Sequence, residues 1–198
     1  MTDCGCEIEV RDKRERKTLI IILGINAIMF VIEFGFGLLA QSTGLIADSL
    51  DMFADASVYS ISLYAVGRSE IIKGNAAKFS GGIQILLAIL VVIDVLRRFI
   101  LGSEPIGPLM IGVGIIALVA NATCLTLISK HRDSGVHMRA SLIFSKNDVI
   151  ANLGVISSGI LVWVMGSRYP DLIIGLIIAL VVFRGGVKIL KEVGNHEK

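Results

Sequence analysis

Three aspartates stand close together in a segment of the chain that is otherwise apolar. Asp48, Asp51 and Asp55 lie within residues 44–67, GLIADSLDMFADASVYSISLYAVG. On a helix of 100° per residue the steps between successive aspartates are about −60° and +40°, so the three carboxylates project into one sector. Carboxylates this close repel one another and take up protons unless a cation is near. Because no basic residue precedes Arg68 in this segment, a bound divalent cation is the simplest partner.

A second apolar segment, residues 142–165, offers a matching face. Asp148 and Asn152 are four residues apart and therefore share a helix face, with Asn147 beside them. Such polar side chains can also hydrogen-bond between helices, and a single intramembrane Asn is better explained in that way. Four acidic groups on two helices carry more negative charge than this role needs. We therefore predict a metal site whose candidate ligands are Asp51, Asp55, Asp148, Asn152, Asn147 and Asp48.

The composition places these polar groups in a membrane protein. The chain has 198 residues, of which 54% are hydrophobic and 18% charged, and its mean hydropathy is +0.79. Soluble domains are about 45–50% apolar and about 25% charged. The surplus falls into blocks of about 20 residues, the length that crosses a hydrocarbon core about 30 Å thick. This pattern excludes a soluble enzyme, a nucleic-acid-binding module and a disordered chain, and we expect no enzymatic activity.

The apolar blocks predict an all-α membrane protein with six transmembrane helices. The blocks that contain the acidic residues are the weakest by hydropathy, but their charges sit mid-segment on one face, which a surface helix would not show. We expect residues 1–17 to form an unstructured cytoplasmic tail, residues 18–191 the six-helix transmembrane domain, and residues 192–198 a tail too short to fold. The six blocks lie at residues 18–40, 44–67, 79–101, 107–129, 142–165 and 170–190.

Basic residues indicate the orientation of the chain in the membrane. With six spans both termini lie on one side, and that side carries all of the 19 Lys and Arg residues except Arg97, Arg98 and Arg168. Basic residues that flank membrane helices concentrate in the cytoplasm. We therefore expect a multi-pass protein of the cell membrane, either inner or plasma membrane, with both termini cytoplasmic.

Motifs in five segments, in order along nearly the whole chain, resemble the cation diffusion facilitator family. The resemblance implies a six-helix fold that exports divalent metals from the cytoplasm in exchange for protons. It also implies that the ion is held by a pair on the second helix, which maps onto Asp51 and Asp55, and a pair on the fifth, whose second residue maps onto Asp148. The matching residues are Glu33, Gly37 and Ser42 with LIADSLDMFAD; Asp94, Arg97 and Pro105; GIIALVAN, which ends at Asn121; NDVIANLGVISSG; and Pro170–Asp171.

Three departures separate this sequence from the family pattern. The first ligand of the fifth-helix pair, usually His or Asp, falls on Phe144, which cannot bind a metal, so Asn152, Asn147 or water must take its place. The cytoplasmic domain that normally follows the sixth helix is not in the sequence, so we expect a short form of the family. A histidine-rich cytoplasmic loop is also missing.

The predicted function is proton-coupled efflux of divalent metal cations. The metal is then the transported substrate, no cofactor is expected, and the partners are metal ions, protons, the lipid bilayer and a second copy of the chain, because 21.3 kDa is small for a transporter. Two alternatives remain open. One is a membrane protein that binds, senses or buffers metal without transport. The other is an exporter of small organic cations, which would need an aromatic-lined cavity and has Tyr59 and Tyr64 available.

Several further side chains have a structural and a functional interpretation. Asp94 is expected to form an ion pair with Arg97 one turn along, whereas Glu33 either pairs with Arg97 or binds protons. Cys124 is expected to be a small buried hydrophobe. The N-terminal Cys4 and Cys6 could collect a soft metal, but reduced thiols in a tail are the simpler interpretation.

The topology gives a first testable prediction. A reporter fused after Lys198 should read as cytoplasmic, because basic residues concentrate on the side of the termini. An enzymatic reporter pair that is active on opposite sides of the membrane measures this directly. A non-cytoplasmic reading would mean that one span is miscounted, and the second and fifth blocks are the first to suspect.

Overall fold

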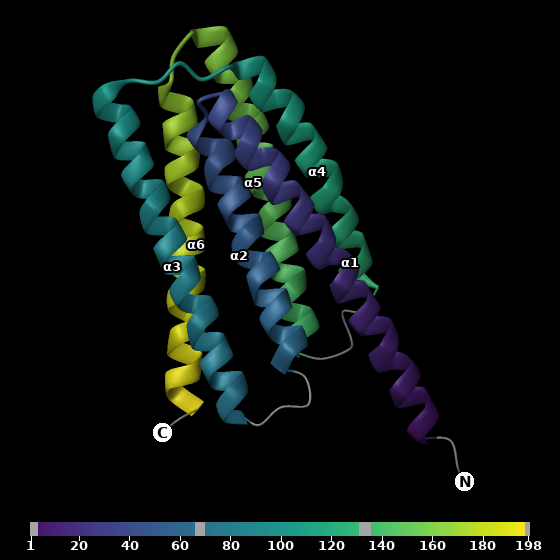
Figure 1. Cartoon of the computed structure of the whole chain (residues 1–198). Coiled ribbons are helices and arrows are strands. Elements are labelled where there is room, and N and C mark those ends of the chain that lie inside the picture. Colours follow the sequence, from purple (N-terminus) through teal and green to yellow (C-terminus); the bar gives the residue numbers. More distant parts are fainter. Residues whose placement is uncertain (1–3, 66–69, 131–135, 197–198) are drawn as a thin grey trace.

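The computed structural model describes residues 4–65, 70–130 and 136–196, and this part of the chain folds entirely into helices and short turns. At several helix ends only the backbone is described, so the side chains of Cys4, Cys6, Tyr64 and Phe144 lie outside the described ones. The helices run side by side as one bundle (Figure 1). They are α1 (Cys4–Leu39), α2 (Thr43–Ala65), α3 (Glu70–Leu101), α4 (Gly107–Ser129), α5 (Val136–Met165) and α6 (Tyr169–His196).

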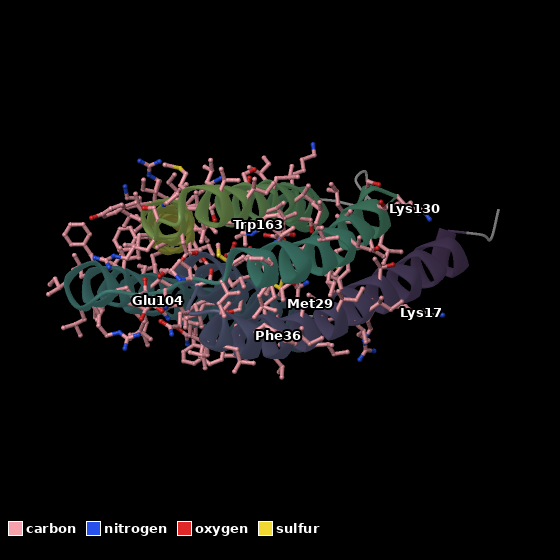
Figure 2. All side chains as sticks on the ribbon, turned by 90° about the horizontal axis from the view of Figure 1, so that it is seen from above. Lys17, Met29, Phe36, Glu104, Lys130 and Trp163 are labelled. Atoms are coloured by element: carbon pink, nitrogen blue, oxygen red, sulfur yellow. The ribbon has the colours of Figure 1, made fainter. Side chains whose placement is uncertain are left out.

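Five of the six helices are long and apolar enough to cross a membrane. In their most apolar stretches only 28–33% of the residues are buried within the structure, so most of their apolar side chains point outward. Figure 2 shows carbon-rich side chains around the outside of the bundle, among them Trp163, which is 67% exposed. An apolar exterior of this extent suits contact with lipid. The five spans are Arg16–Leu39, Lys78–Leu101, Gly107–Ser129, Ser145–Met165 and Tyr169–Lys191.

The prediction of an all-α protein is therefore confirmed, but the prediction of two unstructured tails was wrong. Helix α1 begins at Cys4 and includes most of the charged tail, and α6 continues to His196. The reason is helix propagation: once a long helix is nucleated, each added residue costs little, and Glu, Lys and Arg are good helix formers.

Helix α2 is the exception among the six because it carries three aspartates, and it lies in the middle of the bundle (Figure 1). It contacts α1, α3, α5 and α6. Every residue from Ser42 to Ser49 is buried. A polar helix in this position faces other helices instead of lipid, which lowers the cost of placing ionisable side chains at membrane depth.

Small residues bring two helix pairs into close contact around α2. A Cβ atom added at Gly186 of α6 would lie 2.8 Å from the backbone oxygen of Gly81 in α3. Likewise, a Cβ added at Gly107 of α4 would lie 2.6 Å from the backbone oxygen of Gly159 in α5. Such contacts let helices associate by close backbone packing, which matters because lipid removes the hydrophobic drive between them. The pairs α3–α6 and α4–α5 thus enclose α2 together with α1.

The chain direction places the three short turns at one end of the bundle. The turns after α1, α3 and α5 lie at the upper end in Figure 1, and the free ends of α1 and α6 lie at the lower end. We call the upper end, where residues 40–42, 102–106 and 166–168 lie, the turn end.

Candidate metal-binding site

Acidic side chains from three helices are buried inside the bundle. Glu33 of α1 is 0% exposed, Asp48 and Asp55 of α2 are 1% and 4% exposed, and Asp148 of α5 is 7% exposed. Asp148 lies within electrostatic range of all the others and of Asp51, which is partly buried. The structure therefore brings the aspartates of α2 near the aspartate of α5. This proximity agrees with the acidic faces that the sequence predicted for these two helices. We call these five residues the acidic cluster.

Three polar residues of helix α5 lie on one buried stripe. Ser145, Asp148, Asn152 and Val155 are all buried and follow one another at spacings of three or four residues. This spacing is that of one helix face. Phe144 stands one turn before Asp148 in the same helix, and Asn147 is only partly buried.

Asn152 bridges three helices instead of standing free beside the acidic cluster. Its side-chain nitrogen donates a hydrogen bond to Asp48 Oδ2 in α2. Its oxygen accepts one from Asn121 Nδ2 in α4 at 2.9 Å. Both side-chain ends of Asn152 are thus engaged, which is the helix-bridging role of an intramembrane amide. In this arrangement Asn152 orients Asp48, and its oxygen, which can accept two bonds, already accepts one from Asn121.

Several carboxylate oxygens in the cluster have no protein partner other than another carboxyl group. Within the described part of the chain, Oδ2 of Asp55 has no hydrogen-bond partner, and the oxygens of Glu33 meet only the carboxyl group of Asp48, which they can bond only through a shared proton. A buried charge without a partner is costly, so these oxygens have the most to gain from a cation. No group of three or more His, Cys, Asp or Glu among the described side chains has the geometry of a formed metal site. The cluster therefore supplies neighbouring ligands without a finished coordination shell.

The structure excludes one of the two interpretations of Glu33 and confirms the interpretation of Cys124. Glu33 does not pair with Arg97, because it lies in the bundle interior in range of Asp48. Cys124 is a buried hydrophobe as expected, and it packs with Ile22, Tyr59 and Ile128. Glu33 was hard to place because the face of α1 that meets α2 is set by how the two helices pack, and not by the spacing of residues within either helix.

The amino terminus of α2 is held by a carboxylate from the other end of the chain. Asp171 in the first turn of α6 is 0% exposed. Its Oδ2 accepts a hydrogen bond from Thr43 N at 2.7 Å, and its Oδ1 accepts bonds from Gly44 N at 2.9 Å and Ser42 Oγ at 2.6 Å. Ser42 Oγ in turn accepts from Leu45 N at 3.1 Å. An anion at a helix amino terminus satisfies unpaired N–H groups and complements the helix dipole.

Close packing between α2 and α6 makes this contact possible. A Cβ added at Gly44 would lie 3.0 Å from Asp171 Oδ1 and 2.9 Å from Ile174 Cγ2. One added at Gly175 of α6 would lie 2.7 Å from Thr43 Cγ2. Glycine at both positions therefore lets α2 and α6 approach closely enough for the carboxylate to reach the backbone N–H groups. The position of α2 along the bundle axis follows from this contact.

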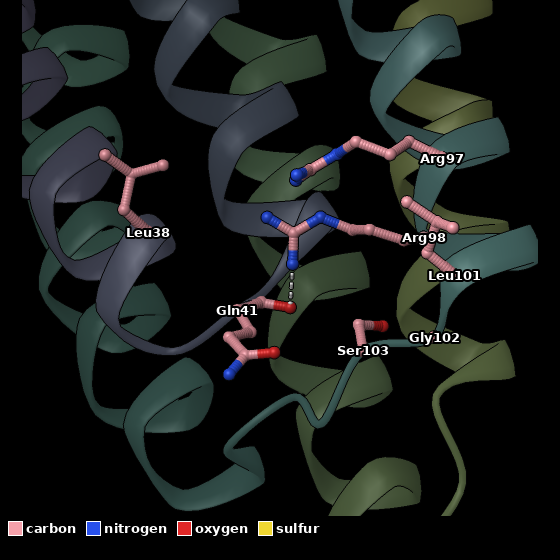
Figure 3. A pocket seen from close by; sticks show the side chains of 7 residues that line it. All are labelled: Leu38, Gln41, Arg97, Arg98, Leu101, Gly102 and Ser103. Carbon is pink, nitrogen blue, oxygen red and sulfur yellow. Dashed lines mark hydrogen bonds between the residues drawn. The ribbon is translucent and has the colours of Figure 1, made fainter.

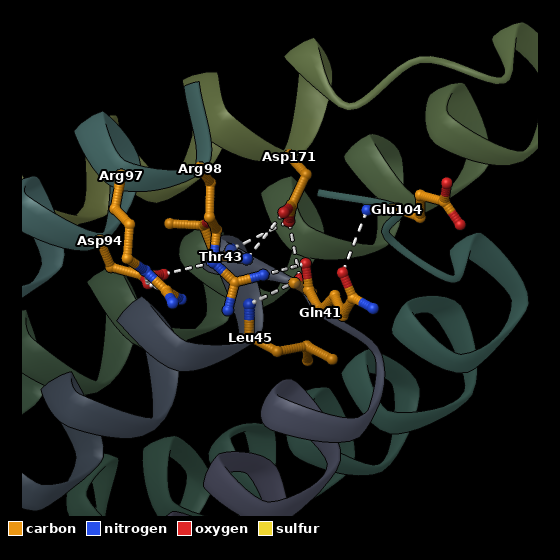
Figure 4. Close-up of polar contacts among 10 residues, drawn as sticks. Gln41, Thr43, Leu45, Asp94, Arg97, Arg98, Glu104 and Asp171 are labelled. Atoms are coloured by element: carbon orange, nitrogen blue, oxygen red, sulfur yellow. Dashed lines mark hydrogen bonds and ion pairs between the residues drawn. The ribbon is translucent and has the colours of Figure 1, made fainter. Parts of the chain in front are cut away.

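A second polar network ties the neighbouring turns together (Figure 4). Asp94 pairs with Arg97 at 2.7 Å, which confirms the predicted ion pair, and also with the buried Arg98 at 2.6 Å. Arg98 Nη1 donates to the backbone oxygen of Gln41, which has a positive φ of 48° between α1 and α2. The side-chain oxygen of Gln41 accepts a bond from Glu104 N at 3.2 Å. The α1–α2 turn is thereby joined to α3 and to the turn that follows it.

Sequence comparison identifies the family to which this chain belongs. The profile of the cation efflux transmembrane domain matches residues 19–195, which include α2 to α5 in full and most of α1 and α6. The chain belongs to the cation efflux family. This result agrees with the resemblance drawn from the motifs.

Curated members of the family are distant relatives of this chain. The zinc transporter ZitB of Yersinia pseudotuberculosis is 25% identical over 189 residues, which cover 89% of this chain and 61% of that protein. ZitB of Escherichia coli is 23% identical over 193 residues, with coverages of 91% and 62%. The cadmium, cobalt and zinc/H(+)-K(+) antiporter of Bacillus subtilis is 23% identical over 192 residues, with coverages of 89% and 61%. The chain thus spans about three-fifths of the length of these relatives.

Several residues that carry the family resemblance hold this cation efflux chain together instead of facing the acidic cluster. Ser42 and Asp171 form the contact at the start of α2, and Asn121 supports Asn152. Gly37 of α1 lies against α2, because a Cβ there would be 3.0 Å from Ile46 Cγ1. Sequence reasoning gave Asp171 no role because its partners are 127–129 residues away. The signal in the sequence that could have indicated a cap is the run Ser42-Thr43-Gly44 at the start of α2, because Ser and Thr are preferred at helix amino termini.

The contact between Asp171 and α2 predicts a strong effect on stability. Asp171→Asn removes the charge and turns an NH2 group toward donors, so we expect about 2–3 kcal/mol of destabilisation. Thermal or denaturant unfolding of the purified protein in detergent measures the change. Glu104→Gln, an equal charge change at an exposed side chain in the α3–α4 turn, is the control. Equal stability of Asp171→Asn and the unaltered chain would contradict the role given to Asp171.

Proposed function

We propose that this protein exports divalent metal cations across a membrane in exchange for protons, and that the ion binds between α2 and α5. The observation that carries the proposal is the burial of Asp48 and Asp55 of α2 within electrostatic range of Asp148 of α5, inside an apolar bundle. Ionisable residues at membrane depth are expensive and mark ion pathways. Membership of the cation efflux family and the names of its zinc-transporting relatives support the same function.

Asp51, Asp55 and Asp148 are the proposed anionic ligands. Asp55 has an unpartnered oxygen, and Asp51 is partly exposed, which leaves a route to water for an arriving ion. Asp48 and Asn152 bond to each other and support the ligands from behind, or join them when the ion enters. Asn147, next to Asp148, or water completes the shell. An all-oxygen set of this kind suits harder divalent ions.

The same carboxylates provide a physical basis for proton coupling. Carboxylates must be deprotonated to bind a metal, so metal binding releases protons and protonation releases metal. A carrier that opens alternately to each side with either metal or protons bound then exchanges one for the other. Both ends of the chain lie at the end of the bundle opposite the turns, and we place them in the cytoplasm on the distribution of basic residues (Figure 1). The functional unit is proposed to be a homodimer.

Transport by the purified protein distinguishes this proposal from its alternatives. Reconstituted into proteoliposomes with a pH gradient, the chain should move Zn²⁺, Mn²⁺, Co²⁺ or Cd²⁺ and dissipate the gradient. A protein that only binds metal would bind these ions without moving them. An organic cation exporter is less well supported, because Tyr59 is packed among the aliphatic side chains of Ile22 and Ile128 and against Cys124.

The proposed ligands give a direct mutational prediction. Replacing Asp51 or Asp55 by Ala should abolish metal tolerance in a sensitive host, because each change removes an anionic ligand. Loss of groups that merely support ligands costs about 10–100-fold in metal affinity, so loss of a ligand should cost at least about tenfold in transport. Proteoliposome flux and growth on metal measure the effect. Glu104→Gln is the matched control, since it removes an exposed negative charge in the α3–α4 turn.

Expression in the membrane must be intact for these variants to be informative. The isosteric Asp51→Asn and Asp55→Asn serve where the Ala variants fail to accumulate. Full metal tolerance of an expressed Asp51→Ala protein would refute the proposed site.

Phe144 predicts the selectivity of the site. Zinc prefers nitrogen and sulfur ligands in tetrahedral sites, so an oxygen-only site should favour Mn²⁺, Fe²⁺ or Co²⁺ relative to a site with an imidazole. Phe144→His places an imidazole one turn before Asp148 in α5. This change should raise the ratio of Zn²⁺ to Mn²⁺ transport, measured as initial flux of each ion in proteoliposomes. The ratio is the right measure because Zn²⁺ binds more tightly than Mn²⁺ at almost any site.

The control for this variant is Phe144→Leu, which removes the ring without supplying a ligand. An unchanged or lower Zn²⁺ to Mn²⁺ ratio in an expressed Phe144→His protein would show that position 144 is not the vacant ligand position.

A further inference from the structure

A pocket of about 300 Å³ lies at the turn end of the bundle, and no residue of the acidic cluster lines it. This volume is at the lower end of the range for small-molecule sites. Figure 3 shows the two arginines of α3 reaching toward the α1–α2 turn across the pocket. The lining residues are Leu38, Gln41, Arg97, Arg98, Leu101, Gly102 and Ser103.

The pocket is lined by two arginines and by no acidic side chain. Asp94 accepts bonds from Arg97 Nε and Nη2 and from Arg98 Nε, and Asp171 also lies within electrostatic range of Arg98. Each guanidinium has five N–H donors, and these bonds together with that from Arg98 to Gln41 use only some of them. The carboxylate of Glu104 points away from the arginines (Figure 4).

Further donors line the same space. Ser103 Oγ has no hydrogen-bond partner among the described residues. The side-chain oxygen of Gln41 is occupied by Glu104 N, which leaves the amide NH2 as the free end of that side chain. A lining with arginine, hydroxyl and amide donors and no acidic side chain complements an anion. Arg in particular matches the fork geometry of phosphate oxygens.

The rim of the pocket is apolar and continuous with the lipid-facing surface. Leu38 is 54% exposed and Leu101 is 78% exposed, and they stand at or next to the last residues of the spans Arg16–Leu39 and Lys78–Leu101. A phosphate held by the arginines would thus have apolar surface beside it, at the depth where a membrane span ends. A free anion would not use this rim, but the acyl chains of a lipid would.

We propose that this pocket binds the phosphate headgroup of an anionic phospholipid. Two of the three basic residues at the turn end line the pocket, at an end of the bundle where such residues are otherwise scarce. The proposal requires the chain to lie in a membrane, but it does not depend on metal transport. The bound lipid would brace the α1–α2 turn against the end of α3, next to the start of α2.

Lipid binding to the purified full-length chain in detergent tests the proposal. The probes are short-chain phosphatidylglycerol, short-chain phosphatidylcholine and inorganic phosphate, and native mass spectrometry counts the bound molecules. We expect saturable binding of phosphatidylglycerol, weaker binding of phosphatidylcholine, and no displacement by millimolar inorganic phosphate. Arg97→Gln should weaken phosphatidylglycerol binding about tenfold, the effect of losing a hydrogen bond to a charged group.

Two further variants make the result decisive. Arg16→Gln removes an exposed arginine near the opposite end of the bundle and should leave the affinity unchanged. Ser103→Asp adds a negative charge to the pocket without touching the Asp94 ion pairs, and it carries the test if Arg97→Gln does not elute as a folded protein. Unchanged phosphatidylglycerol binding in the folded pocket variants would overturn the proposal. Equal binding of both lipids, or binding of inorganic phosphate alone, would do the same.

Discussion

The buried carboxylate of Asp171 sets the position of α2, and the placement of the acidic cluster depends on that position. A helix amino terminus leaves N–H groups without partners, and inside a membrane protein no water is at hand to satisfy them. Asp171 supplies the acceptors from α6, and glycines at positions 44 and 175 allow the close approach. Because α2 is a rigid rod, holding its first turn also sets the depth of Asp48, Asp51 and Asp55.

The polar side chains of the bundle fall into two groups that differ in whether positive and negative groups are paired. At the turn end, ion pairs and hydrogen bonds among Asp94, Arg97, Arg98 and Gln41 tie the turns together. In the interior, acidic side chains from α1, α2 and α5 lie near each other, and the neutral amide of Asn152 donates a hydrogen bond to one of them. An excess of buried negative charge is unfavourable for a purely structural core. This difference is why the interior cluster, and not the turn end, is the proposed cation site.

Much of the fold could be predicted because length and hydropathy identify membrane-spanning helices. Five of the predicted spans are confirmed by the same two properties. Helix α2 was recognisable as a helix from the spacing of its aspartates, although its charge removes it from the apolar spans. The prediction that the two tails are unstructured was wrong. A charge-rich local composition does not determine whether a helix that is already nucleated continues through it. Within the site, the sequence indicated which faces of α2 and α5 carry oxygen ligands, but not that Asn152 is already bonded at both ends.

By itself the sequence determined the helical class, the approximate bounds of the helices and the helix faces on which Asp48, Asp51, Asp55 and Asp148 lie, because hydropathy and the 3.6-residue period are local properties. Its motifs also determined the family. Only the tertiary structure decided that Glu33 joins the acidic cluster, that Asn121 supports Asn152, and that Asp171 caps α2. These contacts join residues on different helices, and some partners are more than 100 residues apart. Their existence depends on how helices pack and how closely glycines let them approach, which no periodicity within one segment can specify.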